Sequence, residues 1–256
     1  MRQNERLNYL ISALLKEEPQ YSDIRIPENI QDKKRLFRSL VNVRPAKAVS
    51  DDFLKIQDEY LQQENTVRGI TDADALIPVK DRICLWQGDI TTLKCDAVVN
   101  AANSGMTGCY YPCHSCIDNA VHTFAGIQLR LECADIMTEQ GFAEPTGSAK
   151  ITKGYNLPAR YVIHTVGPIV SGRLTRKECD QLVSCYCSCL ELAEKNNIKS
   201  IAFCCISTGE FHFPNEKAAE IAVDTVCGYL DKSDIERVIF NVFKDSDREI
   251  YEKLLR

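Results

Sequence analysis

Three cysteines and one histidine lie close together near the middle of the chain, at Cys109, Cys113, His114 and Cys116. Thiolate and imidazole are the ligands that Zn²⁺ prefers, and Pro112 stiffens the turn between the first two cysteines. Three protein ligands would leave one coordination position open for water or substrate, whereas four would make a closed structural site. The spacing therefore predicts a Zn²⁺ site and leaves open which cysteines bind the ion.

Polar residues that suit a nucleotide-like ligand come directly after two predicted strands. Asp89 follows a glycine, and its carboxylate could accept a hydrogen bond from an exocyclic amine such as that of adenine. Asn100 and Asn103 flank two alanines, and their amides could bind sugar hydroxyls. Each pattern also fits an ordinary turn, in which Asp and Asn are common.

A loop of small residues, Ser207-Thr208-Gly209-Glu210-Phe211, follows another predicted strand, and a helix is expected to begin near Asn215. Successive backbone N–H groups and the positive end of a helix favour an anion such as a diphosphate. Phe211 could stack on a ring.

From Leu76 onward, strand-like and helix-like segments alternate, which predicts a mostly parallel sheet covered by helices on both faces. In such sheets ligands bind beyond the carboxyl ends of the strands. The expected strands are Arg82–Gln87, Ala97–Asn100, Tyr161–Val166, Ser200–Ile206 and Arg237–Phe243, and the expected helices are Ile117–Gln140, Thr175–Asn196 and Asn215–Leu230.

Residues 1–75 differ from the rest because they contain no cysteine and show the apolar spacing of three amphipathic helices, around Leu7–Leu15, Leu36–Val41 and Phe53–Leu61. Such short helices bury too little surface alone. We therefore expect a helical extension over 1–75 that packs on an α/β domain over 76–256.

The composition narrows the classes of function. A net charge of -5 and a pI of about 5.5 give no electrostatic attraction to nucleic acid. No apolar run reaches the length of a membrane span, and residues 1–5 do not open a signal-peptide pattern. Thirteen cysteines, an odd number with several inside apolar segments, favour reduced thiols over a disulfide framework. We expect a cytoplasmic protein.

Six segments together resemble, in order and spacing, the motifs of the zinc-containing macrodomain family. The resemblance runs from about Ile83 to the C-terminus, and it implies a three-layer αβα macrodomain with a mixed, mostly parallel sheet and an N-terminal helical extension. The segments are Gly88–Ile90, Ala97–Ser104, Asp118–Gly126, Pro145–Thr152, Val162–Pro168 and Ile206–Gly209. Where the commoner hydrolase macrodomains have a run of glycines, this chain has the cysteine-rich loop.

The resemblance also implies roles for individual residues. Zn²⁺ would be bound by Cys109, His114 and Cys116, with Cys113 as the spare. The remaining roles concern ADP-ribose. Asp89 and Ile90 would meet adenine, and Asn103 and Asn100 would face the distal ribose, against which Phe211 would also pack. The diphosphate would be bound by Ser207, Thr208, Gly209 and Glu210.

The expected activity is zinc-dependent hydrolysis that releases mono-ADP-ribose from a modified protein side chain, with a carboxylate ester as the favoured linkage. Asn103 would hold the sugar, and Asp118 would position or deprotonate water unless it is simply the N-cap of the following helix. His164 is read as a buried structural residue, and His122 as a structural or surface one. The family resemblance also implies a carrier protein modified by a sirtuin-like transferase as substrate.

Two other classes of function remain. A non-catalytic reader of ADP-ribose would keep the binding loops without hydrolysing the ligand. A zinc-stabilised scaffold that binds protein partners would have no affinity for ADP-ribose.

Overall fold

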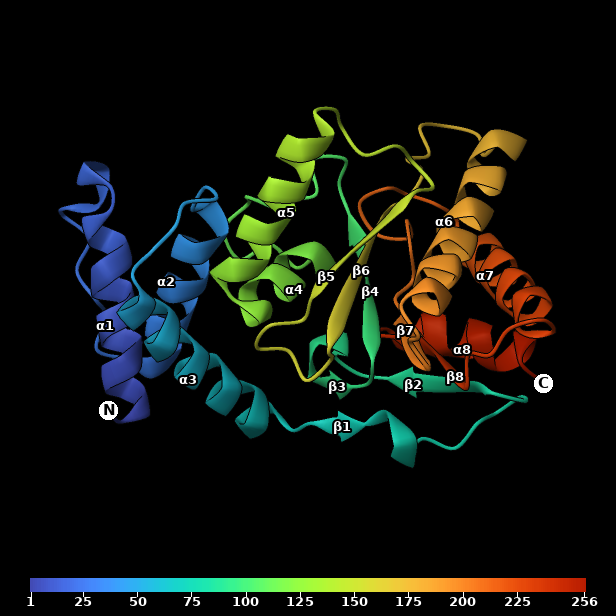
Figure 1. Cartoon of the computed structure of the whole chain (residues 1–256), viewed down its shortest axis with the longest axis horizontal. Helices are drawn as coiled ribbons and strands as arrows, with labels where there is room; N and C mark the ends of the chain where they lie inside the picture. The colour runs from blue at the N-terminus through green and yellow to red at the C-terminus, as the bar shows by residue number, and fades with distance from the viewer.

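The computed structural model describes the whole chain, Met1–Arg256, and its centre is a six-stranded sheet (Figure 1). The strand order is β2-β8-β7-β4-β6-β5, and every neighbouring pair is parallel except β5 and β6. The strands are β2 (Ile83–Gln87), β4 (Ala97–Ala102), β5 (Ala149–Lys153), β6 (Tyr161–Val166), β7 (Ser200–Phe203) and β8 (Arg237–Val242). The predicted α/β fold with a mixed, mostly parallel sheet is confirmed.

Helices cover both faces of this sheet and complete three layers. α4 and α5 lie on one side, and α6, α7 and α8 lie on the other (Figure 1). Their bounds are α4 (Ile117–Ala125), α5 (Ile127–Gln140), α6 (Arg176–Lys195), α7 (Asn215–Leu230) and α8 (Asp245–Leu254). Burial on both faces explains why the central strand β4 is almost continuously apolar.

The predicted helix over Ile117–Gln140 is wrong in one respect, because Gly126 divides it into α4 and α5. Gly126 has φ +100, a conformation that side chains rarely adopt. A Cβ there would also lie 2.7 Å from Nε2 of Gln57 in the N-terminal extension. The backbone conformation therefore favours glycine at the break, and a side chain there would also displace Gln57.

The strand predictions differ from the structure mainly at their ends. β7 stops at Phe203 rather than Ile206, and β8 stops at Val242, which leaves Phe243 beyond the sheet. The antiparallel strand β5 and the helix α8 were not predicted. β5 is an edge strand that is only partly buried, and α8 is short and strongly charged, so neither contains a long apolar run.

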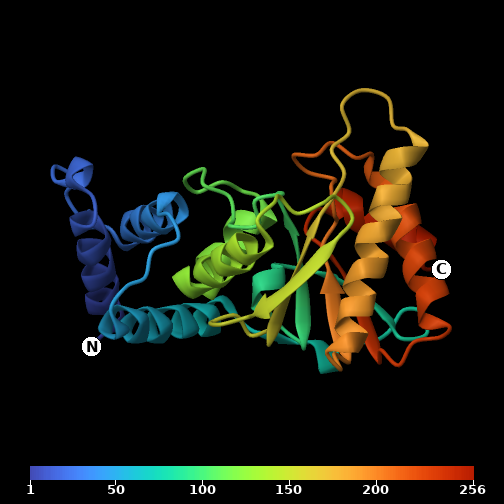
Figure 2. The same cartoon turned by 45° about the horizontal axis from the view of Figure 1, so that its top comes forward.

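The N-terminal extension consists of α1 (Gln3–Lys16), α2 (Ile30–Val43) and α3 (Asp51–Arg68), beside α4 and α5 and away from α6 and α7 (Figure 2). These helices have their own buried apolar cluster, which also contains Ile127 of α5. Arg130 of α5 donates to the carbonyl oxygens of Val41 and Asn42 at the end of α2, at 3.0 and 2.8 Å. The extension is thus packed on the sheet domain by apolar and polar contacts.

A separate parallel pair is formed by β1 (Thr71–Asp72), which precedes β2, and β3 (Leu93–Lys94), which lies between β2 and β4 in the chain. All thirteen cysteines are free. None of the helices combines the length and the apolar composition needed to cross a lipid bilayer.

Candidate functional site

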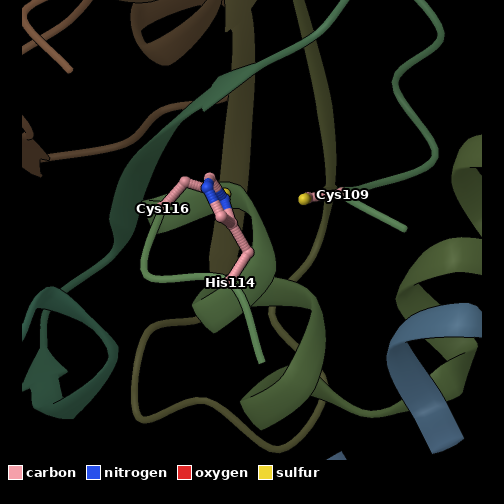
Figure 3. Close-up of side chains that lie close together, drawn as sticks. All are labelled: Cys109, His114 and Cys116. Carbon is pink, nitrogen blue, oxygen red and sulfur yellow. The ribbon is translucent and has the colours of Figure 1, made fainter. Parts of the chain in front are cut away.

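The side chains of Cys109, His114 and Cys116 come together on the loop between β4 and α4 (Figure 3). One donor atom from each lies within 4.8 Å of the other two. Donors on a tetrahedral zinc ion lie about 3.5–3.8 Å apart when Zn–S is about 2.3 Å and Zn–N about 2.0 Å. A small movement of the loop would therefore bring the three donors to the separations found on a zinc ion, and the donor set fits Zn²⁺. His114 Nδ1 is also buried without a hydrogen-bond partner, as expected of a nitrogen that has a metal as its partner.

Cys113 lies on the same loop but points toward the extension. Its Sγ is 3.1 Å from Ser39 Oγ and 3.4 Å from the carbonyl oxygen of Arg35, both in α2. Its backbone N–H donates to Asn42 Oδ1 at 2.9 Å, and its φ of +54 turns the loop at this point. Cys113 is therefore outside the group of three donors.

Helix α2 also fixes the loop through Arg38. Nη2 of Arg38 donates to the carbonyl oxygen of His114 at 2.9 Å and to Oδ1 of Asn119 at 2.8 Å. Asn119 in turn donates to the carbonyl oxygen of Tyr111 at 3.0 Å. These bonds tie both ends of the Tyr111–His114 turn to the helical extension, a connection that the sequence did not indicate.

Asp118 is buried in the first turn of α4, where two amides hold its carboxylate. Asn100 Nδ2 donates to Oδ1 at 2.8 Å, and Asn103 Nδ2 donates to Oδ2 at 3.2 Å. Burial raises the pKa of Asp118 to about 6, although the hydrogen bond from Asn100 opposes the shift. The alternative that Asp118 is the N-cap is wrong, because the N-cap is Cys116, whose Sγ accepts from Asn119 N.

Behind Asp118 lies a buried polar network that includes both histidines of the domain core. His164 is fully buried, as predicted, and burial lowers its pKa to about 3, so that the ring is neutral. Its Nδ1 accepts from Asn100, and its Nε2 donates to Thr152 Oγ1 at 2.9 Å. His122 is also buried, with Nε2 3.6 Å from Asp118 Oδ1, so its reading as a surface residue is wrong and the structural one holds.

The loop Ser207–Phe211 faces the cysteine-rich loop, since Glu210 Oε1 lies 3.6 Å from His114 Nε2. The backbone N–H groups of Gly209, Glu210 and Phe211 donate to no acceptor in the protein. Ser207 has φ +65, and a Cβ on Gly167 would lie 2.0 Å from its Oγ. The loop is therefore held in a shape that leaves three successive amides free, as an anion site requires.

Asp89 and Ile90 follow β2, the first strand in the order, which is separated from β7 by β8. Asp89 Oδ1 accepts from the backbone N and the Oγ1 of Thr91, at 2.9 and 2.6 Å. Ile90 is buried, so only its backbone can meet a ligand. Phe243, directly after β8, is 75% exposed, and its carbonyl oxygen accepts from Gln87 Nε2 beside Gly88. Phe243 was not among the predicted site residues, although its position directly after a strand could have indicated it.

The predicted residues thus meet at one edge of the sheet, the carboxyl edge of its parallel strands. Asp89 and Phe243 follow β2 and β8 at one end of the strand order, and the amides of Gly209–Phe211 and the metal-binding residues follow the central strands β7 and β4. Asn100 differs, because its side chain is fully buried and its Nδ2 contacts Asp118 and His164. Its expected contact with the distal ribose stays a prediction, and in the structure it holds Asp118.

Residues 99–222 match the model of the family described as Macro domain. The chain is 56% identical over 260 residues to a protein-ADP-ribose hydrolase of Treponema medium, with 100% of each chain covered. It is 49% identical over 251 residues to a protein-ADP-ribose hydrolase of Staphylococcus aureus (strain MSSA476), covering 97% of this chain and 94% of that protein.

Two solved structures are also similar. The Oceanobacillus iheyensis macrodomain with ADP is 34% identical, with a TM-score of 0.64 over 70% of this chain and 93% of that one. The Trypanosoma brucei macrodomain in complex with ADP-ribose is 32% identical, with a TM-score of 0.66 over 86% of this chain and 95% of that one.

Proposed function

The chain belongs to the macrodomain family, and on that premise we propose that it is a zinc-dependent hydrolase that releases mono-ADP-ribose from modified protein side chains. Relatives that match it over nearly their whole length are protein-ADP-ribose hydrolases. Zinc dependence, the linkage and the residues involved are the parts of the proposal that go beyond these relatives.

One juxtaposition carries the proposal. The donor group Cys109, His114 and Cys116 lies beside the free amides of the Ser207–Phe211 loop, with Glu210 3.6 Å from His114. A diphosphate bound by those amides would bring the attached distal ribose next to the three donors. The anomeric carbon of that ribose is where the bond to the modified side chain would break.

The chain's own residues would divide the work of binding and of proton transfer. The amides of Gly209, Glu210 and Phe211 would bind the diphosphate, and Asn103 would bind a distal-ribose hydroxyl in place of the Gly108 carbonyl it now contacts at 3.1 Å. Asp118, held by two amide donors and free of any capping duty, would orient the attacking water and accept its proton. Asn100 would keep Asp118 in that orientation.

Zn²⁺, when bound by Cys109, His114 and Cys116, would supply Lewis-acid chemistry by orienting distal-ribose hydroxyls or by lowering the pKa of a water. Three protein ligands leave a position open for such a group. The orientation of Cys113 toward Ser39 supports this ligand set over one that would close the site.

A carboxylate ester is the linkage we favour. When the bond between the anomeric carbon and an ester oxygen breaks, the side chain leaves as a carboxylate, which needs little help from a general acid. The substrate would be a mono-ADP-ribosylated protein. The family resemblance suggests a carrier protein modified by a sirtuin-like transferase.

The proposal is tested by following release of ADP-ribose from proteins modified through defined linkages, with and without a chelator. We expect release from the ester-linked substrate that stops when zinc is removed, while the circular dichroism spectrum stays unchanged. Unchanged turnover in rigorously metal-free protein would refute zinc dependence. Tight binding of ADP-ribose without release would favour the reader, and no binding in calorimetry would favour the scaffold.

A further inference from the structure

Arg68, the last residue of α3, crosses from the helical extension to the loop after β2. Its guanidinium forms an ion pair with Oδ2 of Asp89 and lies 3.6 Å from the centroid of the Phe124 ring. Nη2 also donates to Thr91 Oγ1 at 2.7 Å, and Nη1 donates to Asn65 Oδ1 at 2.9 Å. Four neighbours, two on the loop after β2, one on α4 and one on α3 itself, therefore fix the plane and position of this side chain.

The contacts of Asp89 leave one part of its carboxylate free. Oδ1 accepts two bonds from Thr91, and Oδ2 accepts one from Arg68. A carboxylate has about four acceptor sites, so roughly one remains, on Oδ2. The side chain of Asp89 is 41% exposed, compared with 22% for Arg68, so the remaining acceptor faces solvent at the carboxyl edge of the sheet.

From these contacts we propose that Arg68 sets the preference for adenine, by holding Asp89 so that its one free acceptor site meets an exocyclic amine. The inference rests on the proposed function, in which Asp89 binds the adenine of ADP-ribose. A base with an amine at that position would donate to Asp89. A base with a carbonyl oxygen there would bring two acceptors together and be rejected.

Arginine is suited to this role and lysine is not. The planar guanidinium can stack on Phe124 while its separate N–H groups reach Asp89, Thr91 and Asn65. An ammonium group is a single point charge and cannot keep all these contacts. Without Arg68 the Asp89 side chain would keep only its bonds to Thr91 and would be free to turn Oδ2 toward water.

The test compares the binding of ADP-ribose with that of its hypoxanthine analogue, inosine diphosphate ribose, in which a carbonyl replaces the amine. Calorimetry would be done on the zinc-loaded full chain and on Arg68→Ala, Arg68→Lys and Arg6→Ala. Arg6 is the matched control because it is an arginine of the same extension that bonds to Glu59 and Gln63 and does not contact the β2 loop.

Wild type and Arg6→Ala should prefer ADP-ribose. Arg68→Ala should bind ADP-ribose roughly 10- to 100-fold more weakly, the size of one lost charged hydrogen bond, with little change for the analogue. Arg68→Lys should lose most of the preference too, and it serves as the test if the alanine variant fails to fold.

An unchanged ratio of the two affinities in both Arg68 variants would overturn the inference. So would tighter ADP-ribose binding by Arg68→Ala, because Arg68 would then be a competitor for Asp89. If wild type binds neither nucleotide, the proposed function itself fails, an outcome that is distinct from a wild type that binds ADP-ribose with a preference independent of Arg68.

Discussion

Replacing Arg38 with alanine should weaken zinc binding, although Arg38 is not a ligand. Its guanidinium donates from Nη2 to the carbonyl oxygen of His114 at 2.9 Å, and from Nη2 and Nε to Oδ1 of Asn119 at 2.8 and 3.1 Å. Without these bonds the turn that carries His114 keeps only the contacts of its neighbour Cys113 with α2. The metal would then have to supply more of the order of the loop.

The expected loss of zinc affinity is about 10- to 100-fold, as is typical when a partner of a metal ligand is removed. That range corresponds to about 1.4–2.7 kcal/mol. A hydrogen bond to a charged group contributes about 1.5–3 kcal/mol net, so one such bond accounts for the whole effect. Arg38→Lys should lie between wild type and Arg38→Ala, because an ammonium can reach one acceptor but not both in a fork.

The assay is titration of metal-free protein with zinc in competition with a chromogenic chelator, together with urea unfolding of each metal-free variant. Arg6→Ala is the control, since Arg6 bonds to Glu59 and Gln63 within the extension. Wild-type zinc affinity in Arg38→Ala would refute the reasoning. Equal losses in the Arg38 and Arg6 variants would also refute it, because the effect would then reflect general loosening of the extension.

Three further predictions concern the site. Cys109→Ala should abolish stoichiometric zinc, and Cys113→Ala should retain it, since only Cys109 is in the donor group; equal loss by elemental analysis would overturn the ligand set. Asp118→Asn should lower kcat by about 10²–10⁴-fold with ADP-ribose affinity nearly unchanged, and a loss below tenfold would exclude a proton-transfer role. Gly108→Ala should lower the free energy of unfolding by about 1–3 kcal/mol. Gly108 has φ +88, and a Cβ would lie 2.8 Å from the His122 ring. An unchanged midpoint of urea unfolding would contradict this prediction.

Much of the site could be predicted because its residues follow directly from the ends of strands. Asp89, Asn103 and the Ser207–Phe211 loop each come after a segment with a clear strand pattern, and parallel strands bring their carboxyl ends to one edge. The cysteine-rich loop is also local, so spacing alone indicated a metal site, whereas the choice of Cys109, His114 and Cys116 came from the family resemblance.

The rest depended on contacts between residues far apart in the sequence. Arg38 and Arg68 look like ordinary exposed helical arginines, and only the docking of the extension brings them to His114 and Asp89. The choice between two roles for Asp118 likewise depended on whether its carboxylate meets a helix N–H or the amides of neighbouring residues. Neither the docking of the extension nor the hydrogen-bond partners of Asp118 can be predicted from the neighbouring residues in the sequence.

The apolar cluster shared by the extension and α5 has a consequence for how the chain folds as it is synthesised. α1, α2 and α3 leave the ribosome first, but Ile127 and Arg130, which complete their packing, come much later. At about 5–20 residues per second the interval after Arg68 lasts roughly 3–12 s. During that time the three helices expose an unfinished apolar face. The arrival of α5 completes the packing of the extension, and α2 of that extension in turn holds the metal-binding loop.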